Sequence, residues 1–150
     1  MEQGHVNSHL QEDGIGIIEF GHPLSNSLPG VILNKLANAI TDLSIRDQCK
    51  VILLKSSGER AFCAGASFDE LVAIKDLEQG KVFFSGFAKV INACRTSNKL
   101  IVARIQGKAV GGGVGIAASA DYAFATEHAS IKLSELAIGI GPFVVGPAVQ

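Results

Sequence analysis

Residues 100–125 read LIVARIQGKAVGGGVGIAASADYAFA. Residues 100–105 form an almost unbroken apolar run, which is typical of a strand buried on both faces. Residues 106–113 predict a glycine-rich loop, residues 114–120 a short helix of small side chains, and residues 121–125 a second strand. This succession of strand, loop, helix and strand predicts an α/β fold with mostly parallel strands.

The sequence before this stretch extends the same pattern. Residues 14–20 (GIGIIEF) and 50–55 (KVILLK) predict two more strands. Helical patterns begin after Gly30, at the capping box of Ser67 and Glu70, and, beyond a loop around Gly80, at residues 82–91. The phenylalanines of this last helix are predicted as core residues; they are Phe83, Phe84 and Phe87. Strands and helices therefore alternate along the chain.

The composition is that of one folded domain spanning residues 1–150. Apolar residues make up 47% and charged residues 18% of the chain, which excludes a disordered polypeptide. A net charge of −1 provides no basic surface, so nucleic acid is not an expected partner. The first residues lack a signal-peptide pattern, and the apolar runs are too short to span a membrane, so no membrane association is expected.

The cysteines and histidines show no ligand pattern. Cys49, Cys63 and Cys94 form no CxxC pair, and their odd number fits no closed set of disulfides. We therefore expect buried, reduced thiols and a cytoplasmic compartment. The 4 histidines are scattered without metal-ligand spacing, so no metal site is expected.

Two glycine-containing loops follow predicted strands. One is the triplet Gly111-Gly112-Gly113, and the other is Ala64-Gly65-Ala66 before the capped helix. Ligands of α/β sheets bind beyond the carboxyl ends of parallel strands, where two free backbone N–H groups could form an oxyanion hole. The alternative for each loop is a tight turn that only allows close packing.

Glu135 is the candidate acid, because it lies within the apolar segment IKLSELAIGIGP. A carboxylate among such residues is partly shielded from water, as suits a general base. The alternative is that Ser134 and Glu135 merely open an exposed helical turn. The spacing of the residues by itself slightly favours the exposed turn.

Residues 113–118 (GVGIAA) also match a dinucleotide-binding fingerprint. The helix before Asp121 is too short for the crossover, because a βαβ unit needs about 30 residues. Glu127 comes too early to bind a ribose, and Glu135 lies beyond the strand. This rival hypothesis predicts binding of NAD without binding of CoA.

Taken together, AFCAGASFDEL (residues 61–71) and residues 105–142 closely resemble the enoyl-CoA hydratase/isomerase, or crotonase, family. The resemblance runs from about residue 14 to the end. It rests on the combination of A-F-C-A-G-A, G-x-x-x-G-G-G and S-E-L-x-x-G. It implies a crotonase-like spiral core of ββα units and an acyl-CoA thioester as substrate and partner, with no cofactor.

The same resemblance implies the site residues. The N–H groups of Ala66 and Gly112 would hold the thioester oxygen as it becomes an enolate, and Glu135 matches one of the two glutamates of the family's hydratases. The loop at residues 64–68 would also receive the adenine end of CoA. Contacts with substrate or CoA are implied for Ala64, Gly65, Ala66, Ser67, Phe68, Gly111, Gly112 and Gly115.

One position departs from the hydratases. Their other glutamate should stand two residues after the glycine triplet, where this chain has Gly115. The family's isomerases keep one glutamate alone, so the resemblance favours Δ3-Δ2 enoyl-CoA isomerase chemistry, with Glu135 as base and then acid. One alternative is hydration with a second acid elsewhere. Gly115 could instead make room for a bulkier acyl group, or for a decarboxylase or dehydratase that uses other residues. The last alternative is a non-catalytic CoA-binding or assembly subunit.

The chain ends at Gln150, a little over halfway through a usual family member. The remaining part normally supplies helices that close the acyl pocket and build trimers or paired trimers. We therefore expect the C-terminal helical part to be absent from this chain. We also expect a homo-oligomer, either a trimer or a dimer of trimers.

Overall fold

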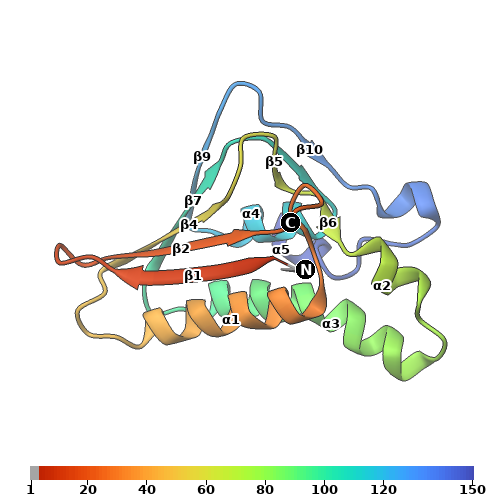
Figure 1. Cartoon of the computed structure of the whole chain (residues 1–150), viewed down its shortest axis with the longest axis horizontal. Helices are drawn as coiled ribbons and strands as arrows, with labels where there is room; N and C mark the ends of the chain where they lie inside the picture. Colours follow the sequence, from red (N-terminus) through yellow and green to blue (C-terminus); the bar gives the residue numbers. More distant parts are fainter. Residues whose placement is uncertain (1–3) are drawn as a thin grey trace.

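The computed structural model describes residues 4–150, whose strands form one large and two small sheets. The large sheet has the order β1-β2-β4-β7-β9 (Figure 1). Its strands are β1 (His5–Leu10), β2 (Ile15–Gly21), β4 (Val51–Ser56), β7 (Leu100–Ile105) and β9 (Tyr122–Ala125). β1 pairs with β2 antiparallel and the other neighbours in this sheet are parallel, so the predicted fold class is confirmed.

The two small sheets are built from very short strands. One has the order β10-β8-β5, with β5 (Ala61–Cys63), β8 (Lys108–Val110) and β10 (Ile131–Lys132). The other pairs β3 (Ser27–Leu28) with β6 (Gly65–Ala66). Three strands of the large sheet each lead into a strand of the first small sheet: β4 into β5, β7 into β8 and β9 into β10. A helix follows each pair, which confirms the spiral of ββα units that the resemblance implies.

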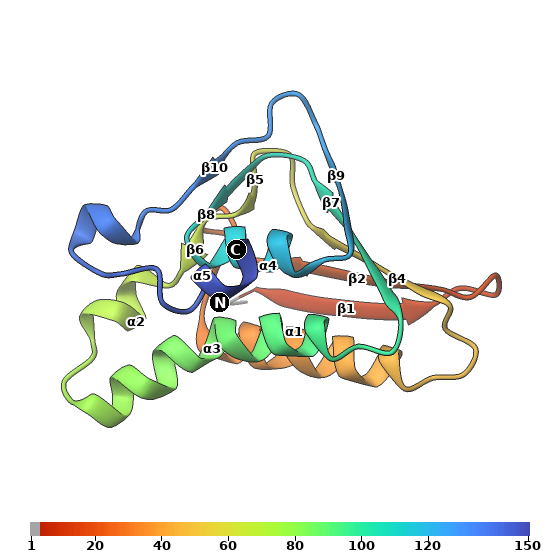
Figure 2. The same cartoon turned by 180° about the vertical axis from the view of Figure 1, so that it is seen from behind.

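The helices lie mainly on one side of the large sheet. They are α1 (Gly30–Ser44), α2 (Phe68–Val72), α3 (Leu77–Arg95), α4 (Gly112–Ser119), the 3-10 helix η1 (Glu135–Ile138) and α5 (Gly146–Val149). Figure 1 shows α1 and α3 running side by side beneath the long strands. From behind, α4 lies between α3 and the short strands, next to α5 (Figure 2).

The core is formed where α1 and α3 pack on the sheet. Ile18 and Phe20 of β2 and Ile52 and Leu54 of β4 are fully buried, and the residues between them are only partly buried. The prediction that residues 50–55 and 100–105 are buried on both faces is therefore wrong. The helices cover one face of these strands completely and leave the other face partly open to solvent.

Two predicted boundaries and one predicted cap also differ from the structure. Gly80 lies inside α3, because Asp76 caps that helix and its carboxylate accepts a hydrogen bond of 2.8 Å from the Gln79 N–H. The segment predicted as one loop, residues 106–113, contains β8 and the first turn of α4. Ser67 is confirmed as the N-cap of α2, since its hydroxyl accepts a hydrogen bond from the Glu70 N–H (3.3 Å). The reciprocal bond of a capping box is not formed, because the Glu70 carboxylate accepts from the Gly30 N–H (2.9 Å) and the Ser67 N–H donates to the Leu28 carbonyl (3.3 Å).

All three cysteines are free and buried in the structure. Burial raises the pKa of the Cys63 thiol to about 12 and that of the Cys94 thiol to about 11. Within residues 4–150, no cluster of His, Cys, Asp and Glu side chains could hold a metal ion. None of the helices in the same range is long and apolar enough to cross a membrane.

Candidate active site

A cavity of about 340 Å3 opens between α2, α3, the start of α4 and the carboxyl-terminal segment. Figures 1 and 2 show α2 and the segment around η1 at the same end of the molecule. The wall is lined by Ser27, Ala64, Gly65, Ala66, Phe68, Leu71, Phe83, Phe84, Phe87, Gly111, Gly112, Ser134, Glu135, Ile138, Ile140, Gly141, Pro142, Val144 and Val145. Both predicted glycine loops and Glu135 therefore face one cavity.

The first loop is held by β3. Gly65 has a positive φ of 97°, which turns the chain between β5 and β6 and which glycine adopts at little cost. The Ser67 N–H donates to the Leu28 carbonyl (3.3 Å). Because successive N–H groups of an extended strand point to opposite sides, the Ala66 N–H points away from β3. It is thus free for a ligand in the cavity that Ala66 lines.

The second loop begins α4. Gly111 is the N-cap residue, with φ 54° and ψ −120°, and its N–H donates to the Lys132 carbonyl (2.9 Å). Gly112 is the first residue of the helix, so its N–H has no acceptor within the helix. A Cβ at Gly112 would collide with the Phe87 ring, which explains why glycine is needed there. A second backbone donor thus reaches the cavity at a helix N-terminus, where the helix dipole favours negative charge.

Glu135 is the first residue of η1 and is half-buried. Its Oε1 atom lies 3.3 Å from where a Cβ of Gly111 would stand, so the carboxylate faces the second loop. Its Oε2 atom is buried and has no hydrogen-bond partner. A buried carboxylate oxygen without a partner is costly, and a substrate C–H or water in the cavity could serve as its counterpart.

The polar content of the cavity wall is small. Within residues 4–150, the lining side chains with a polar atom are Glu135, Ser27 and Ser134, and none of the lining residues is basic. The Ser27 hydroxyl is engaged, because it donates to the Ala66 carbonyl (2.9 Å). The arrangement therefore presents one carboxylate and two backbone donors within an apolar wall, which suits transfer of a proton next to a carbonyl whose oxygen becomes negative.

Two of the predicted contact residues, Ser67 and Gly115, are not part of this wall. Ser67 caps α2 instead. Gly115 is buried within α4, and a Cβ there would lie 2.8 Å from Ile91 Cδ1 and 2.8 Å from Val145 Cγ1. The space beside Gly115 is thus filled by two aliphatic side chains.

The wall also contains residues that the sequence did not indicate. Phe83, Phe84 and Phe87 of α3 were predicted as core residues, yet all three line the cavity. Phe87 alone among them is fully buried, with 6% of its surface exposed. The carboxyl-terminal segment also contributes to the wall, through residues 140–142, Val144 and Val145. Phenylalanines that share one face of a helix could have signalled an aromatic wall, but their spacing does not tell which loop they face.

Comparison with known proteins places this site in context. A sequence model of the family described as enoyl-CoA hydratase/isomerase matches residues 11–149. Methylglutaconyl-CoA hydratase, a mitochondrial protein of Rattus norvegicus, is 31% identical over 137 residues, which cover 89% of this chain and 43% of that protein. Small ribosomal subunit protein mS47 of Neurospora crassa is 30% identical over 133 residues, which cover 85% of this chain and 26% of that protein.

A solved structure agrees with these sequence matches. The enoyl-CoA hydratase of Shewanella pealeana superimposes with a TM-score of 0.89 and 26% identity, covering 99% of this chain and 56% of that chain. The chain thus spans less than two thirds of the length of each of these three proteins.

Proposed function

Because the chain belongs to the enoyl-CoA hydratase/isomerase family, we propose that it binds an acyl-CoA thioester and moves a double bond of the acyl group from C3 to C2. One observation carries the choice of isomerisation. Among the residues that the structure describes, Glu135 is the only carboxylate in the cavity wall, and the place beside Gly115 is filled by Ile91 and Val145. A carboxylate can move a proton by itself, whereas hydration is best served by a second acid that positions water.

In the proposed reaction, the thioester oxygen accepts hydrogen bonds from the Ala66 and Gly112 N–H groups. Glu135 removes a proton from C2, the electron pair of that C–H bond forms a C1–C2 double bond, and the carbonyl π pair moves onto the thioester oxygen. The oxygen then re-forms the carbonyl, the C1–C2 π pair becomes the C2–C3 double bond, and the C3–C4 π pair takes the proton from Glu135 at C4. The product is a 2-enoyl thioester, and the carboxylate is regenerated without any cofactor.

The apolar wall supports this proposal in a second way. Phe83, Phe84 and Phe87 on one side and Val144 and Val145 on the other can exclude water from the dienolate. Such a wall favours an unbranched or lightly branched hydrocarbon acyl group. We propose that the thioester is carried by CoA rather than by a carrier protein.

Hydration is the second candidate, since a relative at 31% identity is a methylglutaconyl-CoA hydratase. It requires an acid outside the described wall. The third candidate is a non-catalytic CoA-binding or assembly subunit, which is favoured by the relative that is a ribosomal subunit protein. Such a subunit would bind CoA without turnover.

A homo-oligomer and a cytoplasmic location belong to the proposal as well. β9 is the edge strand of the large sheet, and its Tyr122 and Phe124 are each 60% exposed. Large apolar side chains on an exposed edge favour association with another copy. A trimer or a dimer of trimers is the state that we propose.

The test is proton NMR of the products formed from a medium-chain 3-enoyl-CoA. The proposal predicts a conjugated 2-enoyl thioester as the sole product. A 3-hydroxyacyl product would establish hydration instead. CoA binding without any product would support the non-catalytic subunit, and NAD binding without CoA binding would favour the dinucleotide fingerprint.

A further inference from the structure

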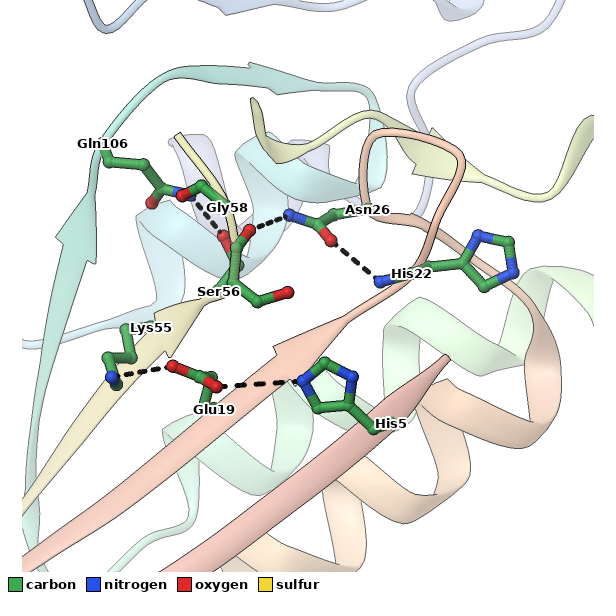
Figure 3. A network of polar contacts seen from close by, with 9 residues as sticks. His5, Glu19, His22, Asn26, Lys55, Ser56, Gly58 and Gln106 are labelled. Carbon is green, nitrogen blue, oxygen red and sulfur yellow. Dashed lines mark hydrogen bonds and ion pairs between the residues drawn. The ribbon is translucent and has the colours of Figure 1, made fainter. Parts of the chain in front are cut away.

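Two amide side chains from distant segments approach the same backbone carbonyl, that of Ala61. Asn26 Nδ2 lies 2.9 Å from this oxygen and Gln106 Nε2 lies 3.2 Å from it. Figure 3 shows Asn26 and Gln106 on opposite sides of the segment that includes Ser56 and Gly58. Ala61 is the first residue of β5, the strand that leads into the first donor loop.

Asn26 is connected to the loop that carries Ala66. It is 4% exposed and has a positive φ of 57°. Its side chain also accepts from the His22 N–H (2.8 Å) and donates to the Ser57 carbonyl (2.9 Å). Its own carbonyl accepts from the Ala64 N–H (3.2 Å). Asn26 therefore contacts Ala61 at the beginning of β5 and Ala64 directly after the end of β5.

Gln106 is connected to the loop that carries Gly112. It lies between β7 and β8, and β8 runs directly into Gly111. Its Nε2 atom is also 2.8 Å from the Ser56 hydroxyl and 3.2 Å from the Gly58 carbonyl. Its Oε1 atom is buried without a partner. The Gln106 amide thus directs its nitrogen towards these three acceptors, although its oxygen has no hydrogen-bond partner.

The backbone ladder is irregular at the place where the amides meet. β5 pairs with β8 through Ala61 with Lys108 and Cys63 with Ala109, with a shift in register between the two pairs. Such a shift leaves one residue unpaired and bends the strand at that point, so the ladder alone does not fix how β5 and β8 lie relative to each other. The two donor loops extend from these two strands, so their separation depends on what holds Ala61.

We propose that Asn26 and Gln106 are positioning residues which, by converging on the Ala61 carbonyl, set the distance between the Ala66 and Gly112 N–H donors. The inference rests on the proposed function, because it assigns the two N–H groups to one thioester oxygen. Neither side chain lines the cavity, so both act through the backbone.

The experiment uses the full chain with Gln106→Met, which keeps the length of the side chain and removes its donor. A second variant, Asn26→Gly, removes the side chain and tolerates the positive φ. Glu19→Gln is the matched control, because the ion pair of Glu19 with Lys55 (2.7 Å) lies in the same region (Figure 3) but is not connected to either donor loop.

The readout is the absorption spectrum of a bound cinnamoyl-type CoA thioester, whose band moves to longer wavelength when its carbonyl oxygen accepts hydrogen bonds. We expect the wild type and Glu19→Gln to show the full shift, and Gln106→Met and Asn26→Gly a smaller one. The affinity for CoA without an acyl group should be unchanged, and kcat for isomerisation should fall about 10- to 100-fold with little change in KM.

The possible outcomes distinguish a failure of the positioning role from a failure of the proposed function. A full shift and wild-type kcat in a folded Gln106→Met variant would overturn the positioning role and leave the proposed function intact. A wild type that binds no CoA, or shows no shift with a bound thioester, would overturn the proposed function and this inference with it. If Asn26→Gly unfolds, as judged by circular dichroism, Gln106→Met alone decides.

Discussion

The loop that carries Ala66 and the segment that carries Glu135 face the same cavity but are held in different ways. The loop is bonded to the distant segment of residues 26–28 through the Ala64 N–H, the Ser67 N–H and the Ala66 carbonyl. The Glu135 segment makes mostly local hydrogen bonds, such as the Ile140 N–H to the Glu135 carbonyl (2.9 Å).

The side chains near the first loop are also less exposed to solvent than those of the Glu135 segment. Cys63, just before the first loop, is fully buried, whereas Leu136 is 71% and Phe143 85% exposed. A region with few buried contacts opens at low free energy. The molecule thus separates two tasks. Under the proposed function, the donors that would meet a developing charge are held through long-range contacts, and Glu135, the proposed proton-transfer group, lies on a segment that local bonds support.

The largest expected effect lies in the exposed segment. Glu135→Gln keeps the shape of the side chain but cannot take a proton, so kcat for isomerisation should fall about 10²- to 10⁴-fold. Binding of CoA should stay at the wild-type level. Glu127→Gln is the control, since the Glu127 side chain is 86% exposed and should have no effect. Wild-type turnover by Glu135→Gln would remove Glu135 from the mechanism.

The next effect lies in the donor region. Gly112→Ala drives a Cβ into the Phe87 ring, so the free energy of unfolding should fall by about 1–3 kcal/mol. The shifted donor should also lower kcat about 100-fold. Gly146→Ala is the control, because a Cβ at Gly146 meets open space. Urea titration measures the free energy of unfolding, and steady-state kinetics measure kcat. If Gly112→Ala and Gly146→Ala had the same stability and the same kcat, the Phe87 ring would not pack closely on Gly112.

At neutral pH the smallest effect is that of the buried thiols, which appears only as a pH dependence of stability above pH 9. Burial raises the pKa of the Cys63 thiol from 9.0 to about 12, so the fold favours the neutral thiol. Its contribution is complete below pH 9 and is lost as the pH rises towards about 12, by at most about 1.4 kcal/mol per pH unit. Cys94 adds a similar loss up to about pH 11.

Urea unfolding between pH 8 and pH 10.5 checks this expectation. The free energy of unfolding of the wild type should decline across the range, and Cys63→Ala should decline less steeply. An identical slope in the two proteins would mean that the thiol beneath the first loop is reached by water.

The long strands and helices could be predicted because each buries one face in a single core, and this burial gives their apolar residues a regular spacing. β1 was missed because most of its side chains are polar or exposed, and β3, β5, β6 and β10 are too short to show a period. Their pairing depends on residues far away in the sequence, such as Ser27 with Gly65.

The candidate site was predicted unevenly for the same reason. Glu135 and the loops at Ala66 and Gly112 carry local motifs, and they do line one cavity. The filling of the space beside Gly115 could not be predicted, because Val145 comes from a segment without a periodic pattern. Whether glycine at a given position leaves a space depends on which side chain folds over it.

The packing of Val145 against Gly115 makes the order of substitutions matter for any evolutionary or engineered route to a two-acid enzyme. A glutamate placed first at Gly115 meets Ile91 and Val145 and adds a buried charge, so it lowers stability before it can act. Shortening Val145 first creates a cavity that removes one of these two contacts, while Ile91 still lies beside the new side chain. We therefore expect the two substitutions to be epistatic, and the order that shortens Val145 first to cost less stability at the intermediate step.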